Sequence, residues 1–316
     1  MTLIPRLGAF ATTRLATQAH AGGPVGPGEG PPAVHSRHVV VDGLRIFYRE
    51  AGDPTLPHIV LLHGFPSSSH MYRKLIPLLA RNFHVVAPDY PGFGHSDMPA
   101  PTHYRYSFDQ LARTMDGFLQ VLELTRYVLY MHDYGGPVGL RIASAHPERV
   151  AGLVVQNANA YEEGLSPDVM KVLQPFWAER TAVTEAPVRG FLTLDATRGQ
   201  YVAGACRPDE LDPDAWVFDQ ALLDRPGNQE IQLSLLADYG SNVALYPQWQ
   251  RYLREYQPKT LIAWGRHDPF FLEAGAHAYL RDLPQARLTL LDSGHFALEE
   301  EAARVASEML ATYGSH

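Results

Sequence analysis

The sequence predicts an α/β fold in which a mostly parallel, doubly wound sheet carries helices on both faces. Continuous apolar runs of strand length end in Gly, Pro or Asp, as in "HIVLLHGFP" at 58–66, and such runs are typical of buried parallel strands. Segments with helical spacing separate these runs, for example 107–124, where Ser107 can serve as N-cap. Strand and helix patterns that alternate along a chain predict a parallel sheet.

The predicted elements follow one another in a regular order. Residues 37–52 alternate in polarity around Asp42-Gly43, which indicates a two-residue hairpin. Up to residue 160, strands are expected within 58–66, 83–97, 126–133 and 151–160, and helices within 67–82, 107–124 and 135–150. After a long interruption the pattern resumes with a strand in 259–269, a helix in 272–283, a strand in 286–295 and a terminal helix.

The interruption indicates how the chain is divided. Residues 161–256 have helical patterns, many aromatic side chains and no clear buried strand. A helical cap inserted here would cover the carboxyl ends of the strands, where open α/β sheets bind ligands. We therefore expect an α/β core from residues 37–160 and 257–316, a cap from 161–256, and a disordered extension over 1–36, which is rich in Gly and Pro.

Composition narrows the class of protein. The 316 residues carry a net charge of -8, which disfavours nucleic acid and anionic membranes as partners. No apolar run approaches the roughly 18 residues of a membrane span. The single cysteine, Cys206, cannot form an intramolecular disulfide, which favours a cytoplasmic location. The 15 histidines show no metal-binding spacing, so neither a metal nor another cofactor is expected, while the oligomeric state stays open.

Sharp turns follow four of the predicted strands and should meet at one edge of the sheet. The turns are Gly64-Phe65-Pro66, Asp133-Tyr134-Gly135, His267-Asp268-Pro269 and Ser293-Gly294-His295. The order Asp133, Asp268, His295 corresponds to nucleophile, acid and histidine of a catalytic triad. Aspartate is also a common helix N-cap, but a cap does not require Tyr-Gly-Gly after it or partners at the two other turns.

From about residue 37 onward, the chain resembles an α/β hydrolase with a cap domain. The motifs "HGFP", "DYPGFGHSD", "HDYGG", "GRHDP" and "DSGHF" carry this resemblance by occurring in that order. More narrowly, the chain is similar to the branch that contains epoxide hydrolases and haloalkane dehalogenases, in which the nucleophile is aspartate. The loop after the strand in 151–160 offers only Asn157 and Asn159 where some relatives keep their acid, which leaves Asp268 as the partner of His295.

One position departs from the family pattern. Met131 stands two places before Asp133, where relatives carry a small residue. We expect Gly135 and Gly136 to relieve the resulting strain, because they let the turn and the helix pack closely.

A carboxylate at the nucleophile position indicates substitution at a saturated carbon. An aspartate has a reference pKa of about 3.9, and the N-terminus of the following helix should keep Asp133 ionised. Its attack on a small apolar organic substrate yields an alkyl ester, which water activated by His295 then hydrolyses. The backbone N–H groups of Phe65 and Tyr134 are expected to hold the oxyanion formed in that step.

Two leaving groups remain possible. An epoxide oxygen needs a proton donor, and the resemblance implies Tyr239, which stands 29 residues before Asp268. The second cap tyrosine expected near 178–181 is missing, and the nearest aromatic residue is Trp177, which could line the pocket or donate to a halide.

The residue after Asp133 is Tyr134, where dehalogenases usually carry tryptophan, and the first turn offers Phe65 where an asparagine would hold a halide. Both positions favour an epoxide hydrolase that forms a vicinal diol. A haloalkane dehalogenase is the alternative. A ligand-binding protein without turnover is a third possibility.

Overall fold

The computed structural model describes Gly30 and residues 32–314, and the chain from Pro32 onward forms one compact unit. Most of the extension predicted over residues 1–36 lies outside the described residues. Strand β1 (His35–Val41) begins two residues before the predicted start of the core.

The described residues form an eight-stranded sheet in the order β1-β2-β4-β3-β5-β6-β7-β8. Strand β1 pairs antiparallel with β2 (Leu44–Ala51), and β2 pairs antiparallel with β4 (His84–Pro88). All other neighbours are parallel, and these strands are β3 (His58–Leu62), β5 (Tyr127–His132), β6 (Val150–Gln156), β7 (Thr260–Gly265) and β8 (Arg287–Leu291). The predicted fold class is confirmed.

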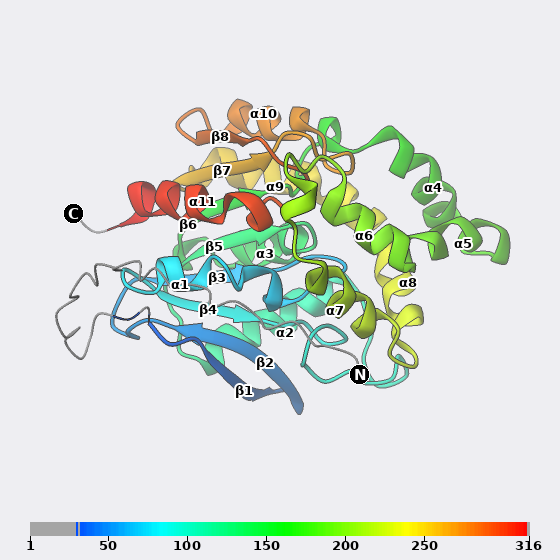
Figure 1. Cartoon of the computed structure of the whole chain (residues 1–316), viewed down its shortest axis with the longest axis horizontal. Coiled ribbons are helices and arrows are strands. Elements are labelled where there is room, and N and C mark those ends of the chain that lie inside the picture. The colour runs from blue at the N-terminus through cyan, green and yellow to red at the C-terminus, as the bar shows by residue number, and fades with distance from the viewer. Residues whose placement is uncertain (1–29, 31, 315–316) are drawn as a thin grey trace, which may run out of the picture. The chain divides into compact units, whose positions relative to one another are not determined.

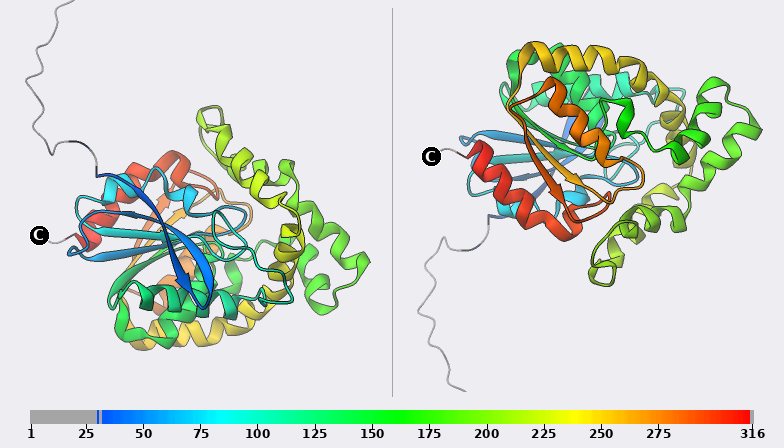
Figure 2. Two further views of the ribbon diagram at one scale, coloured as in Figure 1. Left: turned by 90° about the horizontal axis from the view of Figure 1, so that it is seen from below. Right: turned by 90° about the horizontal axis from the view of Figure 1, so that it is seen from above.

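Helices cover both faces of the sheet (Figure 2). One face carries α2 (Phe108–Val121), α3 (Gly135–Ala145), α9 (Gly240–Tyr256) and α10 (Glu273–Asp282), and the other carries α1 (Ile76–Leu79) and α11 (Leu298–Tyr313). The sequence of β5 is continuously apolar because both of its faces are buried. Leu129 and Met131 pack in the core on the side of α2 and α3, and Val128 and Tyr130 pack in the core on the side of α1 and α11. Both faces of a central strand are buried, so no polar alternation remains.

The single helix predicted within 67–82 is wrong. This segment forms a 3-10 turn, η1 (Ser69–Tyr72), and the one-turn helix α1, separated by three residues. Ser68 accepts a hydrogen bond from the His70 N–H and begins η1, while Pro77 lies in the first turn of α1. Proline lacks an N–H and therefore starts a helix more readily than it continues one.

Between β6 and β7, the described chain contains helices and no strand (Figure 1). The helices α4 (Pro167–Ala178), α5 (Ala182–Arg189), α6 (Leu194–Val202), α7 (Pro213–Leu223) and α8 (Asn228–Asp238) lie beyond the carboxyl ends of the parallel strands. Helix α9 follows and contacts α3 and α10 beside the sheet. Within the described part of the chain, none of the helices combines the length and the apolar character needed to cross a bilayer.

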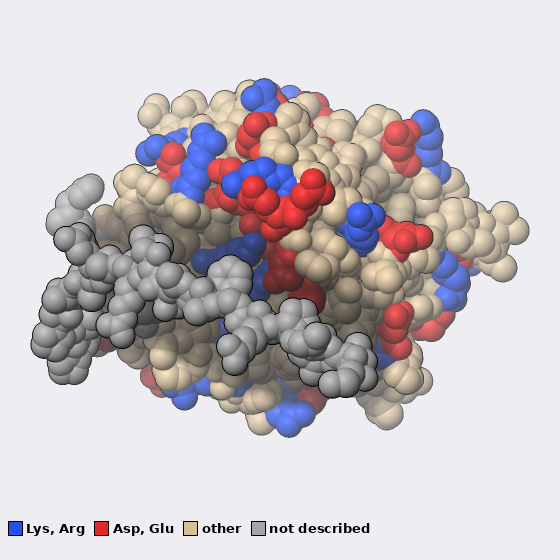
Figure 3. All heavy atoms as spheres, viewed as in Figure 1, with Lys and Arg blue, Asp and Glu red and all other residues tan. Residues whose placement is uncertain are grey.

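Acidic and basic side chains lie beside one another over much of the face shown in Figure 3. Several of them are paired around the start of α11. The carboxylate of Glu299 is 2.7 Å from Arg73 and 2.9 Å from Lys74. Two hydrogen bonds join Arg73 and Glu299 side by side, a geometry that orders both side chains.

Candidate active site

Asp133 lies in a sharp turn between β5 and α3. Its φ of 49° is in the left-handed region, which non-glycine residues rarely adopt. The turn brings α3 close to β3, since a Cβ on Gly135 would lie 2.1 Å from the carbonyl oxygen of Leu62. Room for Met131 comes from Gly139, where a Cβ would lie 2.5 Å from the methionine sulfur. Gly139 thus makes room for the large side chain of Met131, in addition to the predicted Gly135 and Gly136.

The carboxylate of Asp133 is buried and faces backbone donors. Its Oδ1 accepts a hydrogen bond of 2.6 Å from the N–H of Phe65, and the N–H of Tyr134 also donates to the carboxylate. Burial raises the pKa of Asp133 to about 6, although His295 and the two N–H groups lower it. The predicted effect of the helix N-terminus is therefore outweighed by burial, and the carboxyl loses its proton as the pH rises through about 6.

His295 and Asp268 form a buried hydrogen-bonded pair. Nδ1 of His295 lies 2.7 Å from Oδ2 of Asp268. Oδ1 of Asp268 accepts from the N–H groups of Phe270 at 2.7 Å and Phe271 at 3.1 Å. Burial alone would lower the pKa of His295, but the charge and hydrogen bond of Asp268, with the charge of Asp133, raise it above its usual range. The pair is thus arranged for a histidine oriented by a carboxylate.

Asn157 holds this pair in place. Its Nδ2 donates to Oδ2 of Asp268 at 2.8 Å, and to the carbonyl of Gly265 at 3.1 Å, while its Oδ1 accepts from the Gly265 N–H at 2.9 Å. The backbone carbonyl of Asn157 accepts a hydrogen bond of 3.2 Å from the N–H of Asp133. The sequence does not predict this role of Asn157. Its place at the end of a predicted strand is the one signal that could have indicated it.

A cavity of about 90 Å³ connects the predicted site residues. Asp133, His295, Phe65, Tyr134, Trp177 and Tyr239 all line it. Most of the remaining wall is apolar. Helix α4 and the loop after β7 contribute several of these residues, for example Leu173 and Phe271. The structure thus brings the predicted residues to one small, largely apolar space, whereas Asp268 lies behind His295.

Tyr239 joins α8 to α9 and contributes its ring to the cavity. The ring lies 6.0 Å from that of Tyr134, and burial raises its pKa well above the ordinary value, so the hydroxyl stays protonated. The flanking residues bind to core helices. Asp238 accepts from the N–H of Phe108 at 2.8 Å, and Asn242 accepts from Arg141 at 2.7 Å.

Trp177 stacks on Tyr239, with ring centroids 6.0 Å apart and planes inclined by 15°. Its indole N–H donates to the carbonyl of Leu236 at 2.8 Å. The single donor of Trp177 is thus already used, which favours the lining role over the predicted alternative of a halide donor. The residue lines the cavity with its ring.

Two residues that line the cavity carry buried polar groups without a hydrogen-bond partner among the described residues. These are the hydroxyl of Tyr134 and the side-chain amide of Asn159. Buried polar groups without partners are costly. A substrate in the cavity would lie next to both residues, so a small rotation of either side chain could supply it with a partner.

Comparison with known proteins supports the fold and leaves the substrate open. The chain is 41% identical over 280 residues to an uncharacterised hydrolase of Saccharomyces cerevisiae, covering 88% of this chain and 96% of that one. It is 39% identical over 115 residues to a haloalkane dehalogenase of Psychrobacter cryohalolentis, an alignment that covers 36% of this chain and 38% of the dehalogenase.

Among solved structures, an epoxide hydrolase named CorEH superposes with a TM-score of 0.71 at 20% identity, covering 89% of this chain and 99% of that one. At this identity, the likeness shows the fold alone. The family model for the alpha/beta hydrolase fold matches residues 57–302. The chain belongs to the α/β-hydrolase-fold family.

Proposed function

We propose that the protein is an epoxide hydrolase that converts a small apolar epoxide and water into a vicinal diol through an ester of Asp133. The observation that carries this proposal is that Asp133, His295 with Asp268 behind it, and Tyr239, whose phenol is protonated, come together around one cavity. Asp133 supplies the nucleophile, and His295 with Asp268 supplies the base. Tyr239 supplies the acid.

In the first step, a carboxylate oxygen of Asp133 attacks one epoxide carbon. The carbon–oxygen bond of the ring breaks, and the ring oxygen takes the proton of the Tyr239 hydroxyl. The product is a hydroxyalkyl ester. A protonated tyrosine is needed here because an alkoxide is a poor leaving group.

In the second step, His295 removes a proton from water, and the resulting hydroxide attacks the carbonyl carbon of the ester. The charge that develops on the carbonyl oxygen is held by the N–H groups of Phe65 and Tyr134, which already face the carboxylate. The intermediate then collapses, and the bond between the Asp133 carbonyl carbon and the ester oxygen breaks. The departing oxygen takes the proton held by His295, which completes the diol. The proton left on the Asp133 carboxyl returns to the Tyr239 phenolate.

The donors at the cavity favour an epoxide over a halide. The indole N–H of Trp177 is occupied by Leu236, whereas two tyrosines, Tyr134 and Tyr239, line the cavity with phenol side chains that can act as acids. A volume of about 90 Å³ holds several water-sized groups, since one water needs roughly 10–15 Å³ by this measure. This size favours a substrate of few heavy atoms.

A haloalkane dehalogenase is the second candidate, and Asn159 is the observation that favours it. Asn159 lines the cavity, and its amide has no partner among the described residues, so after a rotation toward the cavity it could donate to a halide. The partial alignment with a haloalkane dehalogenase points the same way.

The two chemistries differ in the mass of the ester. The variant His295→Gln should form the ester and fail to hydrolyse it. An epoxide adds its whole mass to Asp133, whereas a haloalkane adds only its alkyl group and releases halide. Intact mass and peptide mapping after incubation with a panel of small epoxides and haloalkanes distinguish them.

Asp133→Ala combined with His295→Gln is the control and should acquire no mass. A full-mass epoxide adduct on Asp133 supports the proposal. An alkyl adduct with free halide establishes the dehalogenase instead, and an adduct on any other residue contradicts an aspartyl ester. If the unaltered protein turns over no member of either panel, the assignment as an epoxide hydrolase fails.

A further inference from the structure

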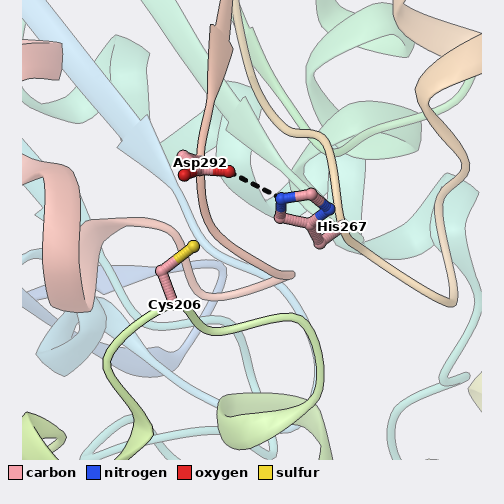
Figure 4. A group of neighbouring side chains, drawn as sticks. All are labelled: Cys206, His267 and Asp292. Atoms are coloured by element: carbon pink, nitrogen blue, oxygen red, sulfur yellow. Dashed lines mark hydrogen bonds and ion pairs between the residues drawn. The ribbon is translucent and has the colours of Figure 1, made fainter.

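Three potential metal ligands meet outside the active-site cavity (Figure 4). They are the thiol of Cys206, the imidazole of His267 and the carboxylate of Asp292, and their ligand atoms all lie within 4.8 Å of one another. Nε2 of His267 and Oδ1 of Asp292 are 2.6 Å apart. All three residues are exposed, so a cation can reach them from solvent.

The three ligands come from three different loops. Cys206 follows α6 in the inserted helical segment, His267 follows β7 next to Asp268, and Asp292 follows β8 three residues before His295. They are far apart in the chain, which explains why no metal-binding spacing is visible in the sequence.

Backbone contacts hold these loops together. The N–H of His267 donates to the carbonyl of Ser293 at 3.1 Å. The glycine two residues before Cys206 packs on the same loop, since a Cβ on Gly204 would lie 2.2 Å from the His267 carbonyl oxygen. The ligands therefore stand on segments whose relative positions are already set.

The carboxylate of Glu300 fixes the loop of Cys206 further. It accepts from the N–H groups of Cys206 at 3.3 Å and Arg207 at 2.7 Å, and from the hydroxyl of Ser293 at 2.6 Å. Only the side-chain torsions of the three ligands are left to adjust.

The donor set selects the kind of cation. Thiolate and imidazole favour zinc and similar transition metals, whereas Mg²⁺ and Ca²⁺ prefer oxygen. With the usual zinc bond lengths, tetrahedral ligands lie roughly 3.3–3.7 Å apart. The pair of His267 and Asp292 would have to open by about 1 Å from its present contact, which exposed side chains allow through rotation.

We propose that Cys206, His267 and Asp292 form a binding site for a zinc-class divalent cation that ties the loop after α6 to the two loops carrying Asp268 and His295. Water completes the coordination as a fourth ligand. Binding replaces the thiol proton by a sulfur–metal bond and releases that proton to solvent, so the affinity rises with pH. The proposal does not depend on the reaction that the active site performs.

Cobalt is the probe for this site, because thiolate bound to Co²⁺ gives an intense charge-transfer band in the near ultraviolet. Cys206 is the single cysteine of the chain, so the band reports on this residue alone. Untagged full-length protein in a thiol-free reductant should develop the band with one equivalent of Co²⁺, and Zn²⁺ should abolish it by displacement.

Cys206→Ser should remove the band, and His267→Gln and Asp292→Asn should each weaken Co²⁺ binding at least about tenfold. His277→Gln is the matched control, since His277 is exposed beside Glu273 at 3.2 Å and lies outside the cluster. It should leave the band unchanged. Circular dichroism of each variant checks that it is folded.

A second measurement uses the unaltered cysteine. Zn²⁺ should slow alkylation of Cys206 by iodoacetamide at least about tenfold in the natural protein and in His277→Gln, and should not protect it in His267→Gln. The absence of a cobalt–thiolate band in the natural protein would overturn the proposal. The proposal would also be overturned if the cobalt–thiolate band, or the protection of Cys206 by Zn²⁺, persisted unchanged in both His267→Gln and Asp292→Asn.

Discussion

Nδ2 of Asn157 donates to Oδ2 of Asp268 at 2.8 Å, and the same oxygen lies 2.7 Å from Nδ1 of His295. One carboxylate oxygen therefore fixes the imidazole and is itself fixed by the amide. Asn157 also pairs with both backbone groups of Gly265, so the amide has little freedom to turn. We infer that Asn157 is a positioning residue for the second chemical step.

Asn157→Ala should slow ester hydrolysis by about 10–100-fold, because a small displacement of Asp268 turns the imidazole away from its water. Ester formation needs only Asp133 and the acid, so its rate should change much less. Rapid quench followed by intact-mass measurement should show the ester accumulating during turnover of the best epoxide. Equal slowing of both steps, or no accumulation, would assign Asn157 a merely structural role.

The pH dependence of ester formation should follow Asp133. Its pKa of about 6 means that the rate falls as the pH drops through 6, because a protonated carboxyl is not a nucleophile. Single-turnover adduct formation in His295→Gln isolates this step. Since the charge of His295 lowers the pKa of Asp133, its removal should move the acidic limb to higher pH. A rate that stays constant from pH 8 to pH 5 would contradict this ionisation.

In steady state His295 adds a second acidic limb. Its pKa is raised, and only the neutral imidazole can accept a proton from water, so ester hydrolysis is lost as the pH falls through that pKa. Tyr239 should add no alkaline limb near pH 10, the ordinary phenol value, because burial raises its pKa well above it. The pH profile of kcat, measured with a stable epoxide, tests both expectations.

Tyr239→Phe should slow epoxide opening by about 10²–10⁴-fold, the range for loss of a positioned general acid. Tyr134→Phe tests whether the unpartnered hydroxyl of this cavity-lining residue supplies the second donor that the cap lacks, and then a loss of similar size is expected. Tyr256→Phe is the control, because that side chain is 56% exposed and distant from the site. Unimpaired opening in Tyr239→Phe would remove this residue from the mechanism.

Asp219 should make stability depend on pH. The residue is buried on α7, accepts from the hydroxyl of Tyr201 at 2.5 Å, and burial raises its pKa to about 7. In the unfolded chain the carboxyl of Asp219 has a pKa of about 3.9, so the folded state holds the proton more tightly. The free energy of unfolding should therefore fall by about 3 kcal/mol as the pH rises from 4 to 7.

Asp219→Asn cannot lose a proton. Relative to the natural protein, its free energy of unfolding should therefore improve from pH 5 to pH 8. Urea unfolding at both values tests this, with the exposed Asp209→Asn as control, whose difference from the natural protein should not change with pH. A difference for Asp219→Asn that is equal at both pH values would contradict the raised pKa.

Much of the fold and the residues that meet at the cavity could be predicted because each depends on local pattern. Buried parallel strands need continuous apolar runs, and a turn after each strand places Asp133, Asp268 and His295 at one edge. The use of the Trp177 N–H by Leu236 could not be predicted, because it depends on how α4 packs on α8. The pKa of Asp133 likewise depends on burial contributed by distant segments.

The anchoring of Tyr239 bears on how this enzyme could change its substrates. Asp238 and Asn242 fasten the tyrosine to α2 and α3, while α4 supplies much of the apolar wall. The proposed proton donor and the apolar wall of the cavity thus lie on different parts of the insertion. Substitutions at Val169, Met170 or Leu173 can reshape the cavity while the tyrosine keeps its position, so libraries at these sites should broaden substrate range with little loss of catalytic competence.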